Sequence, residues 1–90
     1  MGTVLIKIKM MPASPETNLE EIEKKVKEKL EKEEANNISF EIQPIAFGLK
    51  ALIVGFAWPE EKELESFQET LEKIENVNSV EVIDMRRAIG

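Results

Sequence analysis

The spacing of apolar residues along this chain switches repeatedly between two periods, and this switching limits its possible folds more than any other feature. Alternation is typical of a strand with one buried face, and a short unbroken apolar run suits a strand buried on both faces. A spacing of three or four residues marks one face of a helix. In chain order, the segments that show these patterns are 3–10, 19–30, 38–43, 51–58, 64–74 and 77–85. The predicted order is therefore strand, helix, strand, strand, helix, strand.

This order predicts an α+β fold of the ferredoxin-like class, built from two right-handed strand–helix–strand units. We expect a four-stranded antiparallel sheet in the order 4-1-3-2, with both helices on one face. The third strand is the most apolar, as suits a central strand, and Pro44 directly follows the second, as suits an edge strand. Residues 1–90 should form a single domain, because a chain this short builds one core.

The same periodicity predicts which side chains form the core. On the strands, the inward residues are Val4, Ile6, Ile8, Met10, Ile38, Phe40, Ile42, Leu52, Val54, Phe56, Trp58, Val80 and Val82. On the helices, they are Leu19, Ile22, Val26, Leu30, Leu64, Phe67, Leu71 and Ile74. Leu5, Lys7 and Lys9 fall on the opposite face of the sheet, which we expect to be partly wet. Gly55 also falls on that face and predicts a bulge or a close backbone approach.

Three residues or segments predict where the helices begin and end. Asn18 is a favoured N-cap residue, and Glu21 stands three positions later, as in a capping box. The first helix should end near Ala35–Asn37, where asparagine can adopt the left-handed cap. Pro59 should lie at or just before the first turn of the second helix, because proline is favoured there.

The composition argues against an enzyme and against a cofactor. The chain has no histidine and no cysteine, so it lacks the commonest general base, the thiol nucleophile and the usual metal ligands. Most carboxylates fall on the helices beside lysines, which is typical of a solvated helix surface. No serine or lysine stands in a recognisable catalytic motif. We therefore expect no catalysis, no metal site and no cofactor.

Three known uses of the same sandwich also fit poorly. An RNA-binding version would place aromatic residues on the open face of the central strands, but Phe56 and Trp58 point to the core by parity. An acylphosphatase-like anion site would need an arginine in the first loop, where residues 11–18 offer none, and a ferredoxin needs cysteines. The net charge of −6 argues against direct binding of nucleic acid.

Two features remain that core packing does not explain. The first is the turn over residues 45–49, which carries Phe47 and Gly48. Either Phe47 folds back onto the core and Gly48 supplies a left-handed turn, or Phe47 is an anchor presented to a partner. The second is the pair Arg86 and Arg87, the only arginines of the chain, which are either solvated or contact a partner. The sequence does not decide whether the two features share one surface.

Residues 44–52, Pro-Ile-Ala-Phe-Gly-Leu-Lys-Ala-Leu, resemble the hairpin motif of the translation elongation factor 1-beta family, in which Pro-Ile/Val-Gly-Phe/Tyr-Gly-Ile-Lys-Lys-Leu is typical. The helix start at residues 18–21 is also similar, and residues 11–15 and 82–87 resemble the archaeal branch. The resemblance covers the whole chain and is most specific around Phe47. Two positions depart from the pattern, since alanine replaces a frequent glycine at position 46 and the second lysine at position 51.

The resemblance implies a guanine-nucleotide exchange factor that promotes exchange of GDP for GTP on the GTPase elongation factor 1-alpha. It also implies that Phe47 contacts this GTPase and that Gly48 is the turn that presents it. The candidate partner-binding residues are Ile45, Phe47, Gly48, Leu49, Lys50, Arg86 and Arg87. Eukaryotic members have a lysine next to the C-terminus that reaches the GTPase magnesium site. Here Ile89 and Gly90 stand in that region, so this role does not transfer, although Arg86 or Arg87 could substitute for it.

An alternative function is a small-ligand sensing or oligomerisation domain of the same sandwich class. We expect a cytoplasmic protein that does not enter the membrane, because no apolar stretch approaches the length of a membrane span and no signal peptide is recognisable. We also expect a monomer.

Overall fold

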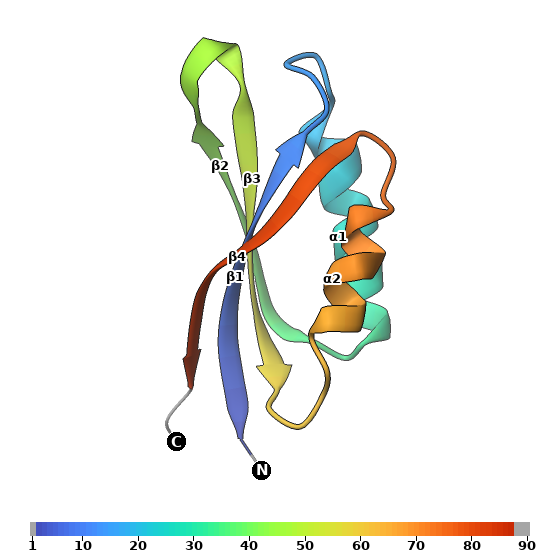
Figure 1. Cartoon of the computed structure of the whole chain (residues 1–90). Coiled ribbons are helices and arrows are strands. Elements are labelled where there is room, and N and C mark those ends of the chain that lie inside the picture. The colour runs from blue at the N-terminus through green and yellow to red at the C-terminus, as the bar shows by residue number, and fades with distance from the viewer. Residues whose placement is uncertain (1, 88–90) are drawn as a thin grey trace.

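The computed structural model describes residues 2–87, and in them a twisted sheet carries two helices on one face (Figure 1). In chain order the elements are β1 (Thr3–Pro12), α1 (Leu19–Lys32), β2 (Asn36–Pro44), the short turn η1 (Ala46–Gly48), β3 (Lys50–Pro59), α2 (Glu65–Glu72) and β4 (Val77–Arg87). This confirms the predicted β-α-β-β-α-β order. Residues 1 and 88–90 lie outside the described part of the chain, and with them the positions of Ile89 and Gly90.

The sheet has the order β2-β3-β1-β4, and all three pairings are antiparallel. This is the predicted order 4-1-3-2 read from the other edge, which confirms the ferredoxin-like fold. Strands β1 and β3 are central, with Ile8 opposite Val54, and β2 is an edge strand that ends at Pro44. No helix in the described part of the chain is long and apolar enough to cross a membrane.

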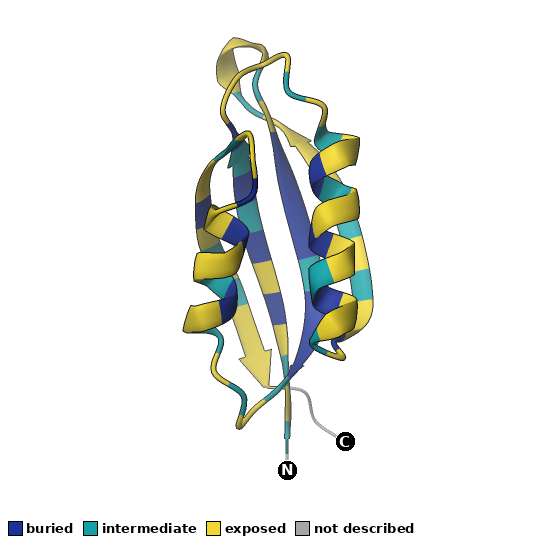
Figure 2. Cartoon of the chain, turned by 90° about the vertical axis from the view of Figure 1, so that its right-hand side faces the viewer, coloured by how far each residue is buried: buried dark blue, intermediate teal, exposed yellow. Residues whose placement is uncertain are grey.

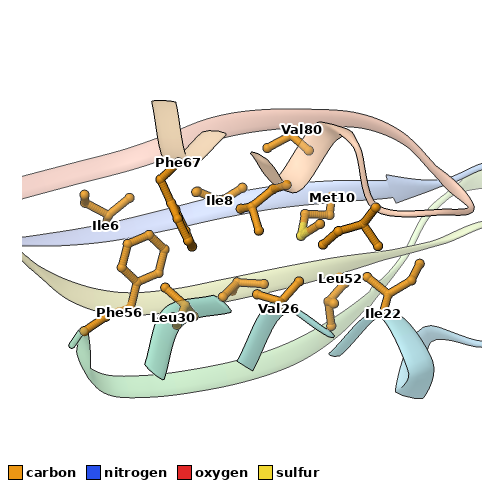
Figure 3. Close-up of a cluster of buried hydrophobic side chains, with 14 of the residues drawn as sticks. Ile6, Ile8, Met10, Ile22, Val26, Leu30, Leu52, Phe56, Phe67 and Val80 are labelled. Atoms are coloured by element: carbon orange, nitrogen blue, oxygen red, sulfur yellow. The ribbon is translucent and has the colours of Figure 1, made fainter. Parts of the chain in front are cut away.

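The core lies between the sheet and the two helices, and it consists of the predicted stripes. Figure 2 shows the buried positions of both helices turned toward the sheet, and Figure 3 shows their side chains meeting those of β1 and β3. Ile8, Val26, Leu30, Leu52 and Val54 are completely buried. The predicted residues at its margin are partly buried and pack against it, namely Val4, Leu19, Ile38, Phe40, Leu64 and Val82. The periodicity therefore predicted the core correctly except at two positions: it included Ile42, which is exposed, and it omitted Ala35, which belongs to the core.

Ile42 was predicted to be buried, but its side chain is 48% exposed. It pairs with Leu52 in the ladder, and directly paired residues share a face of the sheet, so Ile42 does point to the helix side. Leu52 is completely buried, whereas Ile42 lies on the edge strand and borders a hollow next to the start of α1. The alternation therefore predicted the correct face of the sheet for Ile42. Its exposure arises because neither α1 nor α2 covers this part of the edge strand.

The end of α1 differs from the prediction, because the helix ends at Lys32 and the asparagines belong to β2. Glu34 takes the left-handed conformation, with φ 62°. Its amide donates to the Glu31 carbonyl at 3.1 Å, and the Ala35 amide donates to the Leu30 carbonyl at 3.0 Å. This is the Schellman pattern of bonds, with Ala35 and Leu30 both buried, and that apolar contact fixes the stop before the asparagines. At the other end of α1 the predicted cap is confirmed, since Asn18 Oδ1 accepts from the Glu20 amide at 3.0 Å.

Pro59 was predicted to lie at or just before the first turn of the second helix, but it is the last residue of β3, lies opposite Thr3 of β1 and precedes α2 by six residues. Residues 60–64, which connect β3 to α2, are held by contacts of Lys62 with Trp58 and Glu33. Trp58 Nε1 donates to the Lys62 carbonyl at 3.0 Å, and the Lys62 ammonium lies 5.1 Å from the Trp58 ring centroid. The same ammonium donates to the Glu33 carbonyl at 2.9 Å. Because these contacts order residues 60–64 as a turn, α2 begins only at Glu65.

Candidate functional site

The turn that joins β2 to β3 is tightly closed by its own backbone. The Ile45 amide donates to the Leu49 carbonyl at 2.7 Å, and the Leu49 amide donates to the Ala46 carbonyl at 3.3 Å. Phe47 and Gly48 both have left-handed backbones, with φ 63° and 76°. Two left-handed central residues are the requirement of the type I′ hairpin turn, which matches the twist of the flanking strands.

Phe47 is an outlier in two respects at the tip of this hairpin. Its side chain is 94% exposed, so it does not fold back onto the core. Its left-handed backbone costs about 1–2 kcal/mol for a residue with a Cβ, and a bulky aromatic is rare there. Glycine, asparagine or aspartate would normally occupy this position of the turn. Backbone strain that local packing does not explain is typical of functional positions.

The residues beside Phe47 hold and surround it. Ile45 and Leu49 are half-buried where the hairpin meets the sheet, and Lys50 is exposed at the start of β3 opposite Pro44. Among residues 2–87, Lys50 has no carboxylate within ion-pair distance. At Gly48 there is open space where a Cβ atom would lie, so its positive φ and not crowding favours glycine there. The site therefore offers an apolar tip with one cationic neighbour.

Arg86 and Arg87 lie at the other end of the sheet, far from this turn. Arg87 pairs with Val4 in the ladder, while Leu52, near the hairpin, pairs with Met10. Val4 and Met10 are six positions apart on β1, which corresponds to about 20 Å along the strand. Phe47 lies beyond Leu52, at a still greater distance from Arg87. Figure 1 shows the hairpin and the end of β4 at opposite ends of the molecule. The two candidate groups therefore do not form one continuous surface.

Both arginines have carboxylate neighbours within the chain. Arg86 Nε lies 3.1 Å from Asp84 Oδ2, and Arg87 contacts Glu60 in the connection before α2. The two arginine side chains are nevertheless 77% and 72% exposed. Exposed ion pairs of this kind contribute about 0–1 kcal/mol, so they do not fix the arginines in place.

A third feature, at the hairpin end of the molecule, is absent from the sequence prediction. A hollow of about 330 Å³ separates the hairpin from the loop between β1 and α1, and the exposed Ile42 lines it. The periodicity assigned Ile42 to the core. The hollow could not be predicted from the sequence, because it exists only where the helices leave the edge strand uncovered. No group of three or more acidic residues within residues 2–87 is arranged to hold a metal ion.

The molecule is thus a ferredoxin-like sandwich that presents a strained, exposed aromatic side chain on a closed hairpin. Comparison with known proteins specifies the class further. A family model described as the EF-1 guanine nucleotide exchange domain matches residues 5–88. The chain belongs to this family. It is a nucleotide exchange factor of translation elongation and not an enzyme.

Individual relatives agree with this assignment over almost their full length. Elongation factor 1-beta of Methanocaldococcus jannaschii is 40% identical over 89 residues, which cover 98% of this chain and 100% of that protein. The protein of the same name from Methanothermobacter thermautotrophicus is 44% identical over 92 residues, covering 97% and 98% of the two chains. That from Archaeoglobus fulgidus is 38% identical over 86 residues, covering 94% and 97%. The resemblance inferred from residues 44–52 is thus confirmed.

Proposed function

We propose that the chain, as a single exchange domain over residues 1–90, binds elongation factor 1-alpha through the hairpin tip that carries Phe47. The observation that carries this proposal is the combination of 94% exposure and a left-handed backbone at Phe47. Burying a Phe side chain against a partner contributes about 1.5–3 kcal/mol, and here the side chain is already held outward before binding. The strain of the turn is then part of the free state and does not have to be introduced on binding.

Exchange follows from differential affinity. A factor that binds the nucleotide-free GTPase more tightly than its GDP form must lower the affinity for GDP by the same ratio. The closed turn holds Phe47 in one position. Its contact with the GTPase is therefore lost when the GTPase changes conformation, and this makes the affinity depend on the nucleotide state. In this proposal Ile45, Gly48 and Leu49 maintain the turn, and Lys50 meets an acidic or carbonyl group of the partner.

Arg86 and Arg87 form a second, separate contact with the same GTPase in this proposal. Their exposure and the weakness of their ion pairs to Asp84 and Glu60 support it, because both can exchange these partners for carboxylates of another protein. A GTPase that contacts both groups must extend along the molecule, whose longest dimension is 42 Å. We propose that the factor acts in the cytoplasm as a monomer and does not itself contact nucleic acid or membrane.

A pull-down with purified elongation factor 1-alpha tests this function. The nucleotide-free GTPase should be retained on the immobilised chain, and excess GDP should release it, because the two ligands oppose each other. A GTPase that is not retained without nucleotide, or that is retained equally with excess GDP, would contradict the proposal.

A further inference from the structure

The hollow beside the hairpin is a feature that the function described above leaves unexplained. Its lining residues place it on the helix side of the sheet, between the hairpin and the loop that leads into α1. Its volume is about 330 Å³. Pro15, Thr17 and Leu19 line one side, and Ile42, Gly48 and Lys50 line the other.

Ile42 is the reason to regard this hollow as more than a surface irregularity. It points to the same face as Leu52, which is completely buried, yet nearly half of its own side chain is exposed. Among the described residues, four other large hydrophobic side chains are at least 44% exposed, and one of them is Phe47, five positions along the same hairpin. Ile42, which lines the hollow, and Phe47 are thus both exposed on the same hairpin.

The walls of the hollow are ordered by hydrogen bonds within the loop. The Ser14 amide donates to Thr17 Oγ1 at 3.3 Å, and the Thr17 amide donates to the Ser14 carbonyl at 3.2 Å. The Ala13 amide donates to the Asn76 carbonyl at 2.8 Å, which ties the loop to the start of β4. On the other side, the closed turn around Phe47 fixes the hairpin. The hollow is therefore present before any partner binds.

Gly48 belongs both to the Phe47 turn and to the hollow, and Lys50, the first residue of β3 after the turn, also lines the hollow, so the two surfaces adjoin at Gly48. Phe47 itself does not line the hollow, but its neighbour Gly48 does. Lys50 supplies a donor on the hairpin side, while Glu20 on the opposite side repels a carboxylate. An occupant with an acidic or carbonyl oxygen must therefore place that oxygen near the hairpin.

From this geometry we infer that the hollow is a second subsite for the same GTPase, and this inference rests on the function proposed above. It takes an aliphatic or aromatic side chain of the partner, which packs on Ile42. A carboxylate or backbone carbonyl of the same partner segment accepts a hydrogen bond from the Lys50 ammonium. Phe47 and the hollow then hold the segment from both sides of the turn.

Substitution of Ile42 tests the subsite, with affinity for nucleotide-free elongation factor 1-alpha measured by calorimetry. Ile42→Thr keeps a β-branched residue on the edge strand and removes its apolar end, so it should weaken binding by about five- to tenfold, whereas Ile42→Val should weaken it less than about twofold. Ile83→Thr is the matched control, because Ile83 is 44% exposed but lies on β4, and it should bind as the unmodified chain does.

A second variant guards against a folding defect. Glu20→Trp fills the hollow from the first turn of α1 without changing Ile42, and it should also weaken binding by about fivefold or more, with thermal unfolding unchanged. If Ile42→Thr and Glu20→Trp bind as the unmodified chain while Phe47→Ala loses affinity, the subsite is wrong and the proposed function stands. If the unmodified chain itself does not bind the GTPase, both proposals are wrong.

Discussion

Ser39 Oγ lies 2.7 Å from the position that a Cβ atom on Gly55 would occupy. The two residues are paired across β2 and β3, in the stem of the hairpin that carries Phe47. The prediction of a close backbone approach at Gly55 was wrong, because the close neighbour is the Ser39 side chain, and the nearest backbone atom, the Ile6 carbonyl oxygen, is 3.9 Å away. The neighbouring irregularity lies in β2, where the register shifts between Asn36 and Ser39 and Asn37 has φ 53°.

This contact predicts a coupling between the two positions. Gly55→Ala should force the Ser39 hydroxyl out of its rotamer, which costs about 0.5–1.5 kcal/mol. In a Ser39→Ala background there is no hydroxyl to displace, so the same substitution should be about 1 kcal/mol more favourable there. Chemical denaturation of the four proteins measures the coupling energy. Additive effects, within a few tenths of a kcal/mol, would show that Ser39 does not select glycine at position 55.

Glu34→Gly should stabilise the protein. The left-handed conformation at φ 62° costs a residue with a Cβ about 1–2 kcal/mol, and glycine avoids this cost but loses about 0.4–1 kcal/mol through the greater entropy of its unfolded chain. We expect a net gain of about 0.5–1 kcal/mol in the free energy of unfolding. Glu31→Gly, inside the same helix, is the control. It should lower the free energy of unfolding, because glycine in a helix interior is about 0.5–1 kcal/mol less favourable than alanine. A loss of stability in Glu34→Gly would mean that the Glu34 side chain contributes more than its strained backbone costs.

Replacement of both Arg86 and Arg87 by alanine should weaken binding of elongation factor 1-alpha by about three- to tenfold at low salt, and less at high salt, because the lost contacts are exposed and ionic. Titration at two ionic strengths measures the effect. The double replacement of Lys24 and Lys27 by alanine removes the same charge from the exposed side of α1 and controls for net charge. An equal loss in both double variants would mean that the arginines act only through net charge.

The fold was predictable because it depends on local periodicity. The face that each element buries is visible in the spacing of its apolar residues. Examples are the alternation at Ile6 and Ile8 and the helical spacing at Ile22 and Val26. This spacing can be read without knowledge of the tertiary structure. The element order then restricted the topology to a sandwich with β1 and β3 at its centre.

The structure differs from the prediction at positions where tertiary contacts, and not local sequence, determine the conformation or the burial. The burial of Ala35 against Leu30 ended α1 before the asparagines that local propensity favours as caps. The pairing of Pro59 with Thr3 kept this proline in a strand. Ile42 has the parity of a core residue, and its exposure depends on how far α1 covers the edge of the sheet. Similarly, only the strand register shows that Phe47 and Arg87 lie at opposite ends.

The role of Phe47 is the central claim, and release of fluorescent GDP from elongation factor 1-alpha tests it most directly. Phe47→Ala should reduce the acceleration of GDP release by about tenfold or more, since about 1.4 kcal/mol of lost contact corresponds to a factor of ten. Phe47→Tyr, which keeps the ring, should remain within about threefold of the unmodified chain. Far-ultraviolet circular dichroism and the unfolding midpoint should not change, because the side chain contributes almost nothing to the core. Acceleration by Phe47→Ala equal to that of the unmodified chain would contradict the account.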